Sequence, residues 1–305
     1  MRLGILGAGF TGLEIGRRAA EEGVSVWGTT RSTAKAASLR DAGLSPVILD
    51  GLTLGDGLLK ALARTSHLII SIAPDRHEDV ANPHAPVDPV LIALKERSLT
   101  QVAPGLRWIG YLSTVGVYGN HDGAWVDEDT PAAPASERSR QRVRAENEWI
   151  ETGDALGLPV AVFRLSGIYG PGRNALLTAN EGRSRRMVKP GQVFNRIHVA
   201  DIATATLQAA AQCTGGILNI TDDEPAAPQE VVAFAHELIG TAPPPEIDFE
   251  TADISPMARS FYGENKRVSN ARSRAALGME YAFPNYRTAL SAMWADGSWR
   301  GDGGA

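Results

Sequence analysis

The chain has 305 residues, 43% of them hydrophobic and 21% charged, which is typical of a globular protein rather than a disordered one. Its net charge of −5 gives no basic field that would favour nucleic acid or an anionic membrane. A single cysteine, Cys213, excludes an internal disulfide framework and fits helix packing in a reducing cytoplasm. The chain enters its first predicted strand without a leader, and its apolar stretches, such as 67–73, are strand-sized. We therefore expect a cytoplasmic protein with no membrane span.

A glycine loop follows the first predicted strand. Segment 2–6 predicts a strand and segment 10–22 a helix, with Gly7, Gly9 and Gly12 spaced as G-x-G-x-x-G between them. The first glycine permits a tight turn, the second lets backbone approach a pyrophosphate, and the third lets helix pack close to strand. Because the helix start also offers free N–H groups, this context predicts a dinucleotide site rather than a purely structural turn. The residues assigned to it are Gly7, Ala8, Gly9, Phe10, Thr11 and Gly12.

The turn after the next predicted strand, 24–28, indicates which dinucleotide binds. An NAD site usually carries an acid about 20 residues past the glycines, but from Val24 onward the first acid is Asp41. A guanidinium such as that of Arg31 can instead bind a 2′-phosphate bidentately. We predict NADP(H) in preference to NAD(H), the alternative being that Arg31 is a solvated residue in a polar turn. The residues assigned here are Thr29, Thr30, Arg31 and Ser32.

Strand and helix patterns alternate along the chain, which predicts an α/β fold with a Rossmann-type doubly wound parallel sheet. The predicted strands are 2–6, 24–28, 46–49, 67–72, 107–112, 159–164 and 216–220, and later helices are 136–154 and 199–212. The alternation stops in two regions, which predicts a smaller, C-terminal substrate-side domain. The expected divisions are 1–169 for the NADP-binding domain, completed by about 197–221, then 170–196 and 222–300 on the substrate side, and 301–305 as a frayed tail.

Six motifs spread over nearly the whole chain belong together. They are GAGFTG at 7–12, SIAP at 71–74, YLSTVGVYG at 111–119, FRLSGIYGPGR at 163–173, RIHVADIA at 196–203 and GILNITDDEP at 216–225. In this combination the chain resembles the extended and atypical branch of the short-chain dehydrogenase/reductases, the NAD(P)-dependent epimerase/dehydratase family. The resemblance implies that Ala73, Pro74 and Tyr169 also contact the cofactor.

In that family a Ser or Thr, a Tyr and a Lys four residues later carry out the chemistry, with the tyrosine as acid or base. Matching by motif puts Thr114 at the hydroxyl position, with Ser113 beside it. Arg138 then stands at the tyrosine position and Arg142 at the lysine position. A guanidinium does not titrate near neutral pH, so Arg138 cannot act as the acid or base. We expect Arg142 to keep a cationic role toward ribose, and both arginines to bind ribose or a substrate anion.

Several other residues come from segments that the family places near its cleft, and for each a structural role is the alternative to a chemical one. Tyr118 and Tyr169 fit packing and turn formation, Asp127 and Glu128 fit turn and cap acids, and His121 fits a solvent-facing turn. Asp88 takes the place of the family's Asn on the fourth helix. The remaining candidates are Glu137, a basic loop with Arg183, Arg185, Arg186 and Lys189, the joining residues Arg196, His198 and Asp201, and the aromatic pair Phe261 and Tyr262.

Two functions remain open from the sequence. The first is an NADP(H)-dependent oxidoreductase or epimerase/dehydratase-like enzyme without the Tyr–Lys pair, acting on a small, nucleotide-linked or phosphorylated carbonyl or alcohol. The second is a non-catalytic NADP(H)-binding redox sensor, since a sensor can dispense with the missing pair. No spacing of Cys and His predicts a metal site. By analogy with the family, a homodimer is plausible.

Overall fold

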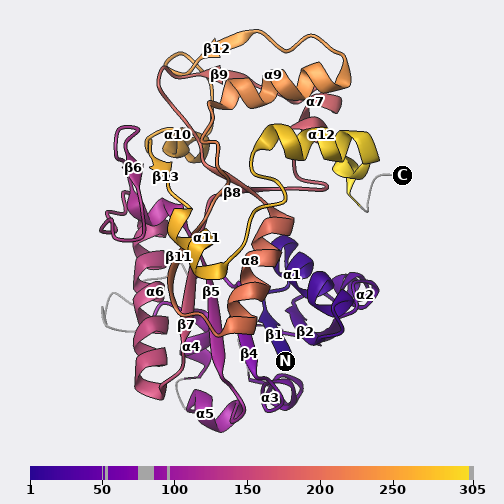
Figure 1. Ribbon diagram of the computed structural model, residues 1–305, viewed down its shortest axis with the longest axis vertical. Helices are drawn as coiled ribbons and strands as arrows, with labels where there is room; N and C mark the ends of the chain where they lie inside the picture. Colours follow the sequence, from indigo (N-terminus) through magenta and orange to yellow (C-terminus); the bar gives the residue numbers. More distant parts are fainter. Residues whose placement is uncertain (50, 52–53, 75–85, 95–96, 302–305) are drawn as a thin grey trace. The chain divides into compact units, whose positions relative to one another are not determined.

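The computed structural model describes residues 1–49, 51, 54–74, 86–94 and 97–301, and these fall into two compact units (Figure 1). Unit 1 consists of Met1–Val117, Ser136–Arg164 and Ile202–Leu218, and unit 2 of Tyr118–Ala135, Leu165–Asp201 and Asn219–Ala305. This division differs from the expected one, because the segments 118–135, 165–169, 197–201 and 219–221 fall in unit 2. Residues 302–305 of the expected frayed tail lie outside the described residues.

A seven-stranded sheet forms the centre of unit 1, in the order β11-β7-β5-β4-β1-β2-β3. The strands are β1 (Arg2–Leu6), β2 (Ser25–Thr30), β3 (Ser45–Ile48), β4 (His67–Ile70), β5 (Trp108–Thr114), β7 (Val160–Leu165) and β11 (Gly216–Ile220). Central strands such as β4 and β7 are buried along their whole length, as expected when helices cover both faces of a parallel sheet. The edge strand β3 is only partly covered and tolerates Pro46. The predicted α/β fold is confirmed.

Helices follow the strands of unit 1 in the predicted alternation. They are α1 (Phe10–Glu21), α2 (Thr33–Asp41), α3 (Asp56–Leu62), α4 (Pro89–Ala93), α5 (Leu99–Val102), the short η1 (Val115–Tyr118), α6 (Glu137–Leu156) and α8 (Val199–Gln212). Figure 1 shows α6 running alongside β7 and β5. The predicted end of this helix at 154 was too early, because the helix continues until Gly157 adopts a left-handed conformation at φ 64°.

One difference from the predicted strands bears on the site. Thr29 and Thr30 were expected in the turn after β2, but they belong to the strand itself and pair with Val47 and Ile48 of β3. Both threonines are β-branched and buried, which suits a strand better than a turn. The turn therefore begins at Arg31.

Unit 2 is built from short elements and three two-stranded parallel sheets, β10–β8, β12–β9 and β13–β6. The strands are β6 (Trp125–Val126), β8 (Gly167–Tyr169), β9 (Arg186–Val188), β10 (Arg196–His198), β12 (Glu246–Asp248) and β13 (Arg267–Val268). The helices are α7 (Ala175–Asn180), α9 (Pro228–Ile239), α10 (Pro256–Phe261), α11 (Ala271–Leu277), α12 (Tyr286–Asp296) and η2 (Ser298–Arg300). The core around α7, α9 and α12 contains Leu176, Val231 and Leu290.

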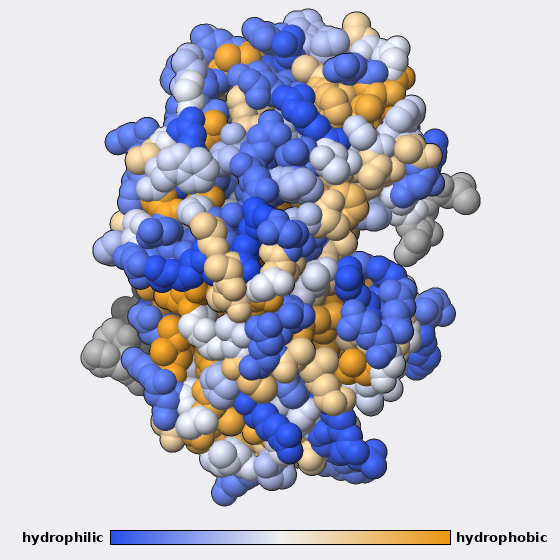
Figure 2. Space-filling model, viewed as in Figure 1, coloured by the Kyte–Doolittle hydropathy of each residue, from blue (hydrophilic) through white to orange (hydrophobic). Residues whose placement is uncertain are grey.

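Figure 2 shows hydrophilic side chains over much of the visible face of each unit. Within the described ranges, no helix is both long and apolar enough to span a membrane. The same ranges hold no group of three His, Cys, Asp or Glu side chains that could bind a metal ion.

Candidate functional site

The glycine loop lies between β1 and α1 and has the geometry that its spacing predicts. Gly7 has a φ of +91°, which an L side chain rarely adopts. A Cβ atom on Gly12 would lie 2.8 Å from the carbonyl oxygen of Gly7, so only glycine lets the helix approach this closely. A Cβ on Gly9, the N-cap of α1, would meet no atom of the described residues within 4 Å. Gly9 is therefore not needed for packing, and its backbone is open to a ligand.

Thr29 braces the loop from the end of β2. The amide N–H of Gly7 donates to Thr29 Oγ1 at 2.7 Å, and the N–H of Ala8 donates to the Thr29 carbonyl oxygen at 2.9 Å. Thr29 is buried, and its hydroxyl oxygen is turned toward the loop. Thr29, assigned to the cofactor turn from the sequence, thus lies buried in the strand, where its hydroxyl oxygen holds the glycine turn.

The turn after β2 presents its charge to solvent. Arg31 is exposed and makes no ion pair with any described residue. Ser32 is the N-cap of α2, and its N–H donates to Thr30 Oγ1 at 3.3 Å, so the Thr30 hydroxyl also faces the backbone of its own turn. Arg31 and the half-buried Ser32 remain the side chains here that can reach a ligand. Ala73 and Pro74, which follow β4, are exposed and half-buried respectively.

A buried network links β5, β7 and α6. Ser113 Oγ donates to Glu146 Oε1, and Glu146 also forms an ion pair with Arg164, with 2.8 Å between Arg164 Nη2 and Glu146 Oε2. The Glu146 and Arg164 side chains are only 2% and 5% exposed, so water screens their interaction weakly. The Ser113 hydroxyl proton is thus used inside the unit, which leaves Thr114 as the hydroxyl available at the end of β5.

Arg142 is held against β5. Its Nη1 donates to Tyr111 Oη at 3.2 Å and to the carbonyl oxygen of Leu112 at 2.9 Å, and its guanidinium lies 5.7 Å from the centre of the Tyr111 ring. Burial raises the pKa of the Tyr111 phenol well above its usual range, so this phenol stays protonated in the interior. The permanent positive charge of Arg142 is therefore held next to Leu112, which lies two residues before Thr114 on β5.

Thr114 and the first turn of α6 meet around Gly116. The N–H of Gly116 donates to Thr114 Oγ1 at 3.1 Å. A Cβ on Gly116 would lie 3.4 Å from Thr114 Oγ1 and 3.4 Å from Ser139 Oγ, so the two hydroxyl oxygens flank one small residue. Arg138 precedes Ser139 and is exposed. Thr114 and Arg142 therefore lie at the carboxyl end of β5, Arg138 lies in the adjoining first turn of α6, and the fourth residue predicted from the motifs, Ser113, points into the core.

Asp88 is the N-cap of α4. Its Oδ1 accepts from the N–H groups of Val90 and Leu91, at 2.9 and 3.3 Å. Burial is the largest influence on this carboxyl group and raises its pKa to about 6. A helix cap needs only an acceptor oxygen, and Asp88 Oδ1 supplies it. Asp88 can therefore take the place of the family's Asn at this position.

In unit 2, the tyrosine and acids around 118–130 have structural roles. Tyr118 Oη donates to Asn219 Oδ1 at 2.8 Å, and both residues are fully buried. Asp127 Oδ1 accepts from the N–H groups of Asp129 and Thr130, as a turn acid does. Glu128 was expected beside it as a surface acid, but it is buried and accepts from the N–H of Asn219 at 3.0 Å.

His121 and Asp201 are two further candidates in unit 2. His121 was expected to face solvent, but it is half-buried and its Nε2 lies 3.0 Å from the carbonyl oxygen of Tyr118. Asp201, for which the sequence left helix capping and pairing with a neighbour open, bonds to a segment far along the chain. Its two oxygens accept from the N–H groups of Ala282 and Phe283, at 2.8 and 3.0 Å, and so fix the segment that precedes α12.

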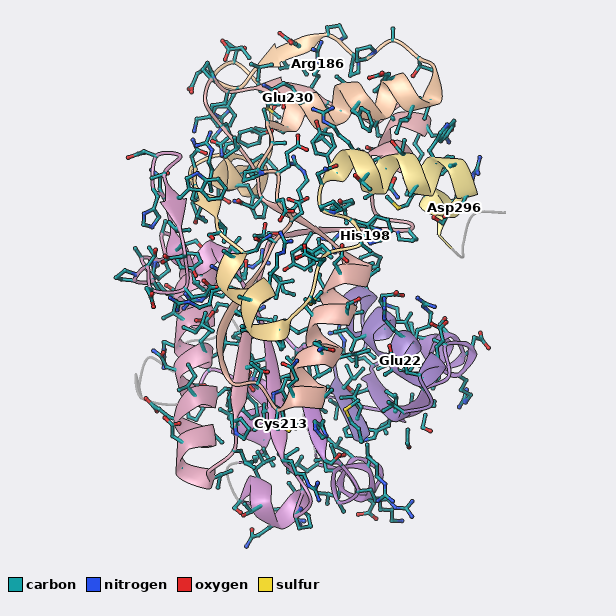
Figure 3. The ribbon with its side chains drawn as sticks, in the orientation of Figure 1. Glu22, Arg186, His198, Cys213, Glu230 and Asp296 are labelled. Carbon is teal, nitrogen blue, oxygen red and sulfur yellow. The ribbon has the colours of Figure 1, made fainter. Side chains whose placement is uncertain are left out.

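A second polar cluster lies inside unit 2, around Tyr169 and His198 of the paired strands β8 and β10. Their ring centres are 5.4 Å apart, and His198 also contacts Phe283 at 4.1 Å. Among the described residues, Tyr169 Oη, His198 Nε2 and Asp222 Oδ2 are buried without a hydrogen-bond partner. His198 and Cys213 stand just before and just after α8, at opposite ends of that helix in Figure 3. Sequence reasoning missed Asp222, since the run Thr-Asp-Asp-Glu that contains it has the composition of an exposed turn.

Burial gives His198 and Asp222 opposite pKa shifts. It lowers the pKa of His198 to about 4 and raises the pKa of Asp222 to about 8, because each group avoids its charged form in the interior. Burial likewise raises the pKa of Tyr169 well above its usual range. All three side chains are therefore neutral at pH 7, and Tyr169 keeps a hydroxyl group that can still bond a ligand.

The raised pKa of Asp222 predicts a measurable pH dependence. Between about pH 4 and pH 8 the carboxyl group is ionised in the unfolded chain but protonated in the folded one, so stability falls as pH rises. Relative to an Asp222→Asn variant, the free energy of unfolding should fall by about 1.4 kcal/mol per pH unit. Urea unfolding of both proteins at pH 5.5 and 7.5 checks this, and a constant difference between them would contradict it.

The basic loop of unit 2 is partly neutralised. Arg183 pairs with Glu181, and Arg186 pairs with Glu246 at 3.0 Å. Arg185 and Lys189 instead donate to the backbone carbonyl oxygens of Asp253 and Tyr262.

Tyr262 is buried in a small aromatic cluster with Phe249 and Phe194, whereas its neighbour Phe261 is 53% exposed. The two aromatic residues therefore have different roles, and only Phe261 is free to cover a ligand. Arg196 donates to the carbonyl oxygens of Phe194 and Ala226.

Known proteins resemble this chain over most of its length. A model described as the NAD dependent epimerase/dehydratase family matches residues 4–221. A solved structure of a functionally unknown conserved protein from Silicibacter pomeroyi DSS is 44% identical, with a TM-score of 0.84 and coverage of 97% of this chain and 99% of that one. Protein YeeZ of Escherichia coli K12 is 26% identical over 93% of this chain and 97% of its own length.

Two further comparisons carry functional names. A 3-diazoavenalumate denitrifying reductase from a Streptomyces species is 27% identical over 54% of this chain and 58% of its own length. The UDP-glucose 4-epimerase of Thermus thermophilus, solved in complex with NAD, has a TM-score of 0.74 at 20% identity, with coverage of 99% of this chain and 100% of that one. At that identity the epimerase demonstrates the shared fold.

Proposed function

The chain belongs to the NAD dependent epimerase/dehydratase family, and we propose that it is an NADP(H)-dependent oxidoreductase or epimerase-like enzyme acting on a small or nucleotide-linked carbonyl or alcohol. The observation that carries the cofactor preference is the end of β2, where the turn offers Arg31 and no carboxylate. A carboxylate there would repel a 2′-phosphate, whereas a guanidinium attracts one.

The glycine loop fits a pyrophosphate. Gly9 has open space where a Cβ would be, and no side chain caps the start of α1, so the first N–H groups of the helix face outward. Thr29 would hold the loop in shape, and Arg31 with Ser32 would face the ribose. When bound, the nicotinamide cofactor supplies or accepts a hydride.

We propose that the substrate end of this site works without a Tyr–Lys pair. Thr114 would orient the reacting oxygen, because its Oγ1 accepts from the N–H of Gly116 and its own proton remains available to a ligand. Arg142 would supply a fixed positive charge beside that oxygen. Neither Arg138 nor Arg142 can give up a proton near neutral pH. The similarity to a reductase supports reduction as the reaction class.

Replacing Arg31 by Glu should weaken NADPH binding by about 10- to 100-fold, because a charge-assisted phosphate contact is lost and a repulsion is added. NADH, which carries no 2′-phosphate, should bind almost as before. Calorimetric titration of both dinucleotides checks this. Arg40→Glu, at an exposed position on α2, makes the same charge change as a control. An unchanged preference in Arg31→Glu would mean that another group binds the phosphate.

A regulatory role is the second candidate, and one observation favours it. In the described part of unit 1, the hydroxyl groups of Ser113 and Tyr111 take part in internal hydrogen bonds, so neither is offered to a substrate as an acid. A sensor of the NADPH/NADP⁺ ratio would bind the reduced and oxidised cofactors with different affinities. Its binding to a partner protein would then depend on which form is bound. Equal affinities for both forms would exclude this role.

A further inference from the structure

The first two turns of α6 carry an unusual arrangement of charge. Arg138, Arg140, Arg142 and Arg144 follow one another at every second position. Cations near the start of a helix are disfavoured by the helix dipole. Like charges four residues apart, as in Arg138 and Arg142, also destabilise a helix. Helix propensity and the helix dipole therefore do not explain this run of arginines, and the surroundings of each residue have to be considered in turn.

Arg140 and Arg138 differ in their surroundings. Arg140 forms an ion pair with Glu137 one turn back, at 2.7 Å, with both side chains about half exposed. Arg138 is exposed and has no acidic partner in the described part of the chain. The two arginines lie two positions apart on one helix, so they point to different sides of it. Arg138 lies on the same side of the helix as Arg142. Unlike the charge of Arg140, the positive charge of Arg138 is not balanced by an acid in the described part of the chain.

Arg142 is already oriented for a ligand. Of its five N–H donors, the two on Nη1 are used by Tyr111 Oη and the Leu112 carbonyl oxygen. Of the remaining three, Nε–H and one hydrogen of Nη2 form the edge that matches the two oxygens of a carboxylate. Because β5 holds the group in place, binding would cost little side-chain entropy.

The position of these donors next to Thr114 defines the site. Thr114 and Ser139 flank Gly116, and Ser139 directly follows Arg138, so the first turn of α6 lies against the end of β5. Leu112, which anchors Arg142, is two residues before Thr114 on the same strand. Arg142 and Thr114 thus lie near the same end of the strand, Arg138 belongs to the helix turn beside it, and no described carboxylate is bonded to Arg138 or Arg142.

We propose that Arg138 and Arg142 bind a carboxylate of the substrate beside the hydroxyl of Thr114, so that the substrate is a small organic acid. This inference rests on the proposed function and names the class of substrate for the same site. A planar anion with two oxygens fits the free edge of Arg142. Arg138, one turn earlier on the helix, would add a second positive charge that attracts the anion. Phosphate is the competing anion that the experiment separates from a carboxylate.

The test uses benzoate and its neutral analogue benzamide as probes. Ligand-observed NMR measures their binding to the full-length protein, with and without saturating NADPH. The wild-type protein should bind benzoate at least about tenfold more tightly than benzamide. Arg138→Gln and Arg142→Gln should each weaken benzoate binding by about tenfold and leave benzamide unchanged. Arg140→Gln removes the same charge from the same helix and should change neither probe.

Several results would overturn the proposal. The first is equal binding of benzoate and benzamide, and the second is no benzoate binding at the solubility limit. The third is a loss of benzoate affinity in Arg140→Gln as large as that in Arg138→Gln. The fourth is binding of inorganic phosphate that excludes benzoate. Thermal melting of each variant confirms that it is folded. Titration of NADPH into the same samples separates the two claims. A wild type that binds no dinucleotide refutes the proposed function, whereas one that binds NADPH but ignores the charge of the probe refutes only the carboxylate site.

Discussion

Glu146→Gln should destabilise the protein by about 3–5 kcal/mol, because it leaves Arg164 as a buried charge without its counterion. Both side chains are at most 5% exposed, so water cannot replace the lost partner. Glu146 also accepts the Ser113 hydroxyl, which connects β5 to the same pair. Urea unfolding followed by circular dichroism measures the loss, with the slope checked to make sure that the unfolded state is unchanged.

Two further variants give this result its meaning. Glu137→Gln breaks the exposed pair with Arg140 on the same helix and should cost no more than about 1 kcal/mol. The double variant Glu146→Leu with Arg164→Met removes both buried charges together, and its loss should be much smaller than that of Glu146→Gln alone. A loss in Glu146→Gln no larger than in Glu137→Gln would show that the buried pair is screened after all.

Gly9→Val should reduce NADPH affinity by about 100-fold or more while leaving thermal stability nearly unchanged. The backbone of Gly9 is extended, with φ −85° and ψ −157°, and a Cβ there would meet no atom of the described residues within 4 Å. The methyl groups would instead occupy the space through which a pyrophosphate approaches the loop. A loss of about 100-fold corresponds to about 2.7 kcal/mol of binding free energy.

Gly55 offers a matched control for this change. It is the N-cap of α3, has an extended backbone, and would also place a Cβ in open space. Gly55→Val should therefore leave both stability and NADPH affinity as they are. Gly12→Val is the opposite case, because its side chain would collide with the Gly7 carbonyl oxygen and should reduce stability as well as binding. Full affinity in a folded Gly9→Val protein would contradict the assignment of the glycine loop.

The sequence predicted the sheet and the glycine loop because both depend on local patterns. Apolar runs such as 67–70 and the spacing of Gly7, Gly9 and Gly12 determine their own conformation. The end of β2 was harder to predict, because Thr29 and Thr30 could belong to a strand or a turn until β3 pairs with them. Pairing with β3 places Thr29 in the strand, where its hydroxyl oxygen stabilises the glycine loop.

The candidate site shows the same contrast. Motif spacing predicted Thr114, Arg138 and Arg142 as site residues, but it could not separate Ser113 from Thr114, since the two differ only in the face of β5 they occupy. The network around Ser113 depends on Arg164, far along the chain. Asp222 could not be found either. Its burial results from packing of unit 2, and nothing in its neighbouring residues distinguishes it from the exposed acids beside it.

Isothermal titration of the purified protein with NADPH, NADP⁺ and NADH tests most directly whether this chain is an NADP(H) protein. We expect NADPH to bind at least about tenfold more tightly than NADH, because the glycine loop holds either pyrophosphate while Arg31 contacts only the 2′-phosphate. Equal or tighter binding of NADH would contradict the role of Arg31. Binding of no dinucleotide at all would contradict the cofactor site itself.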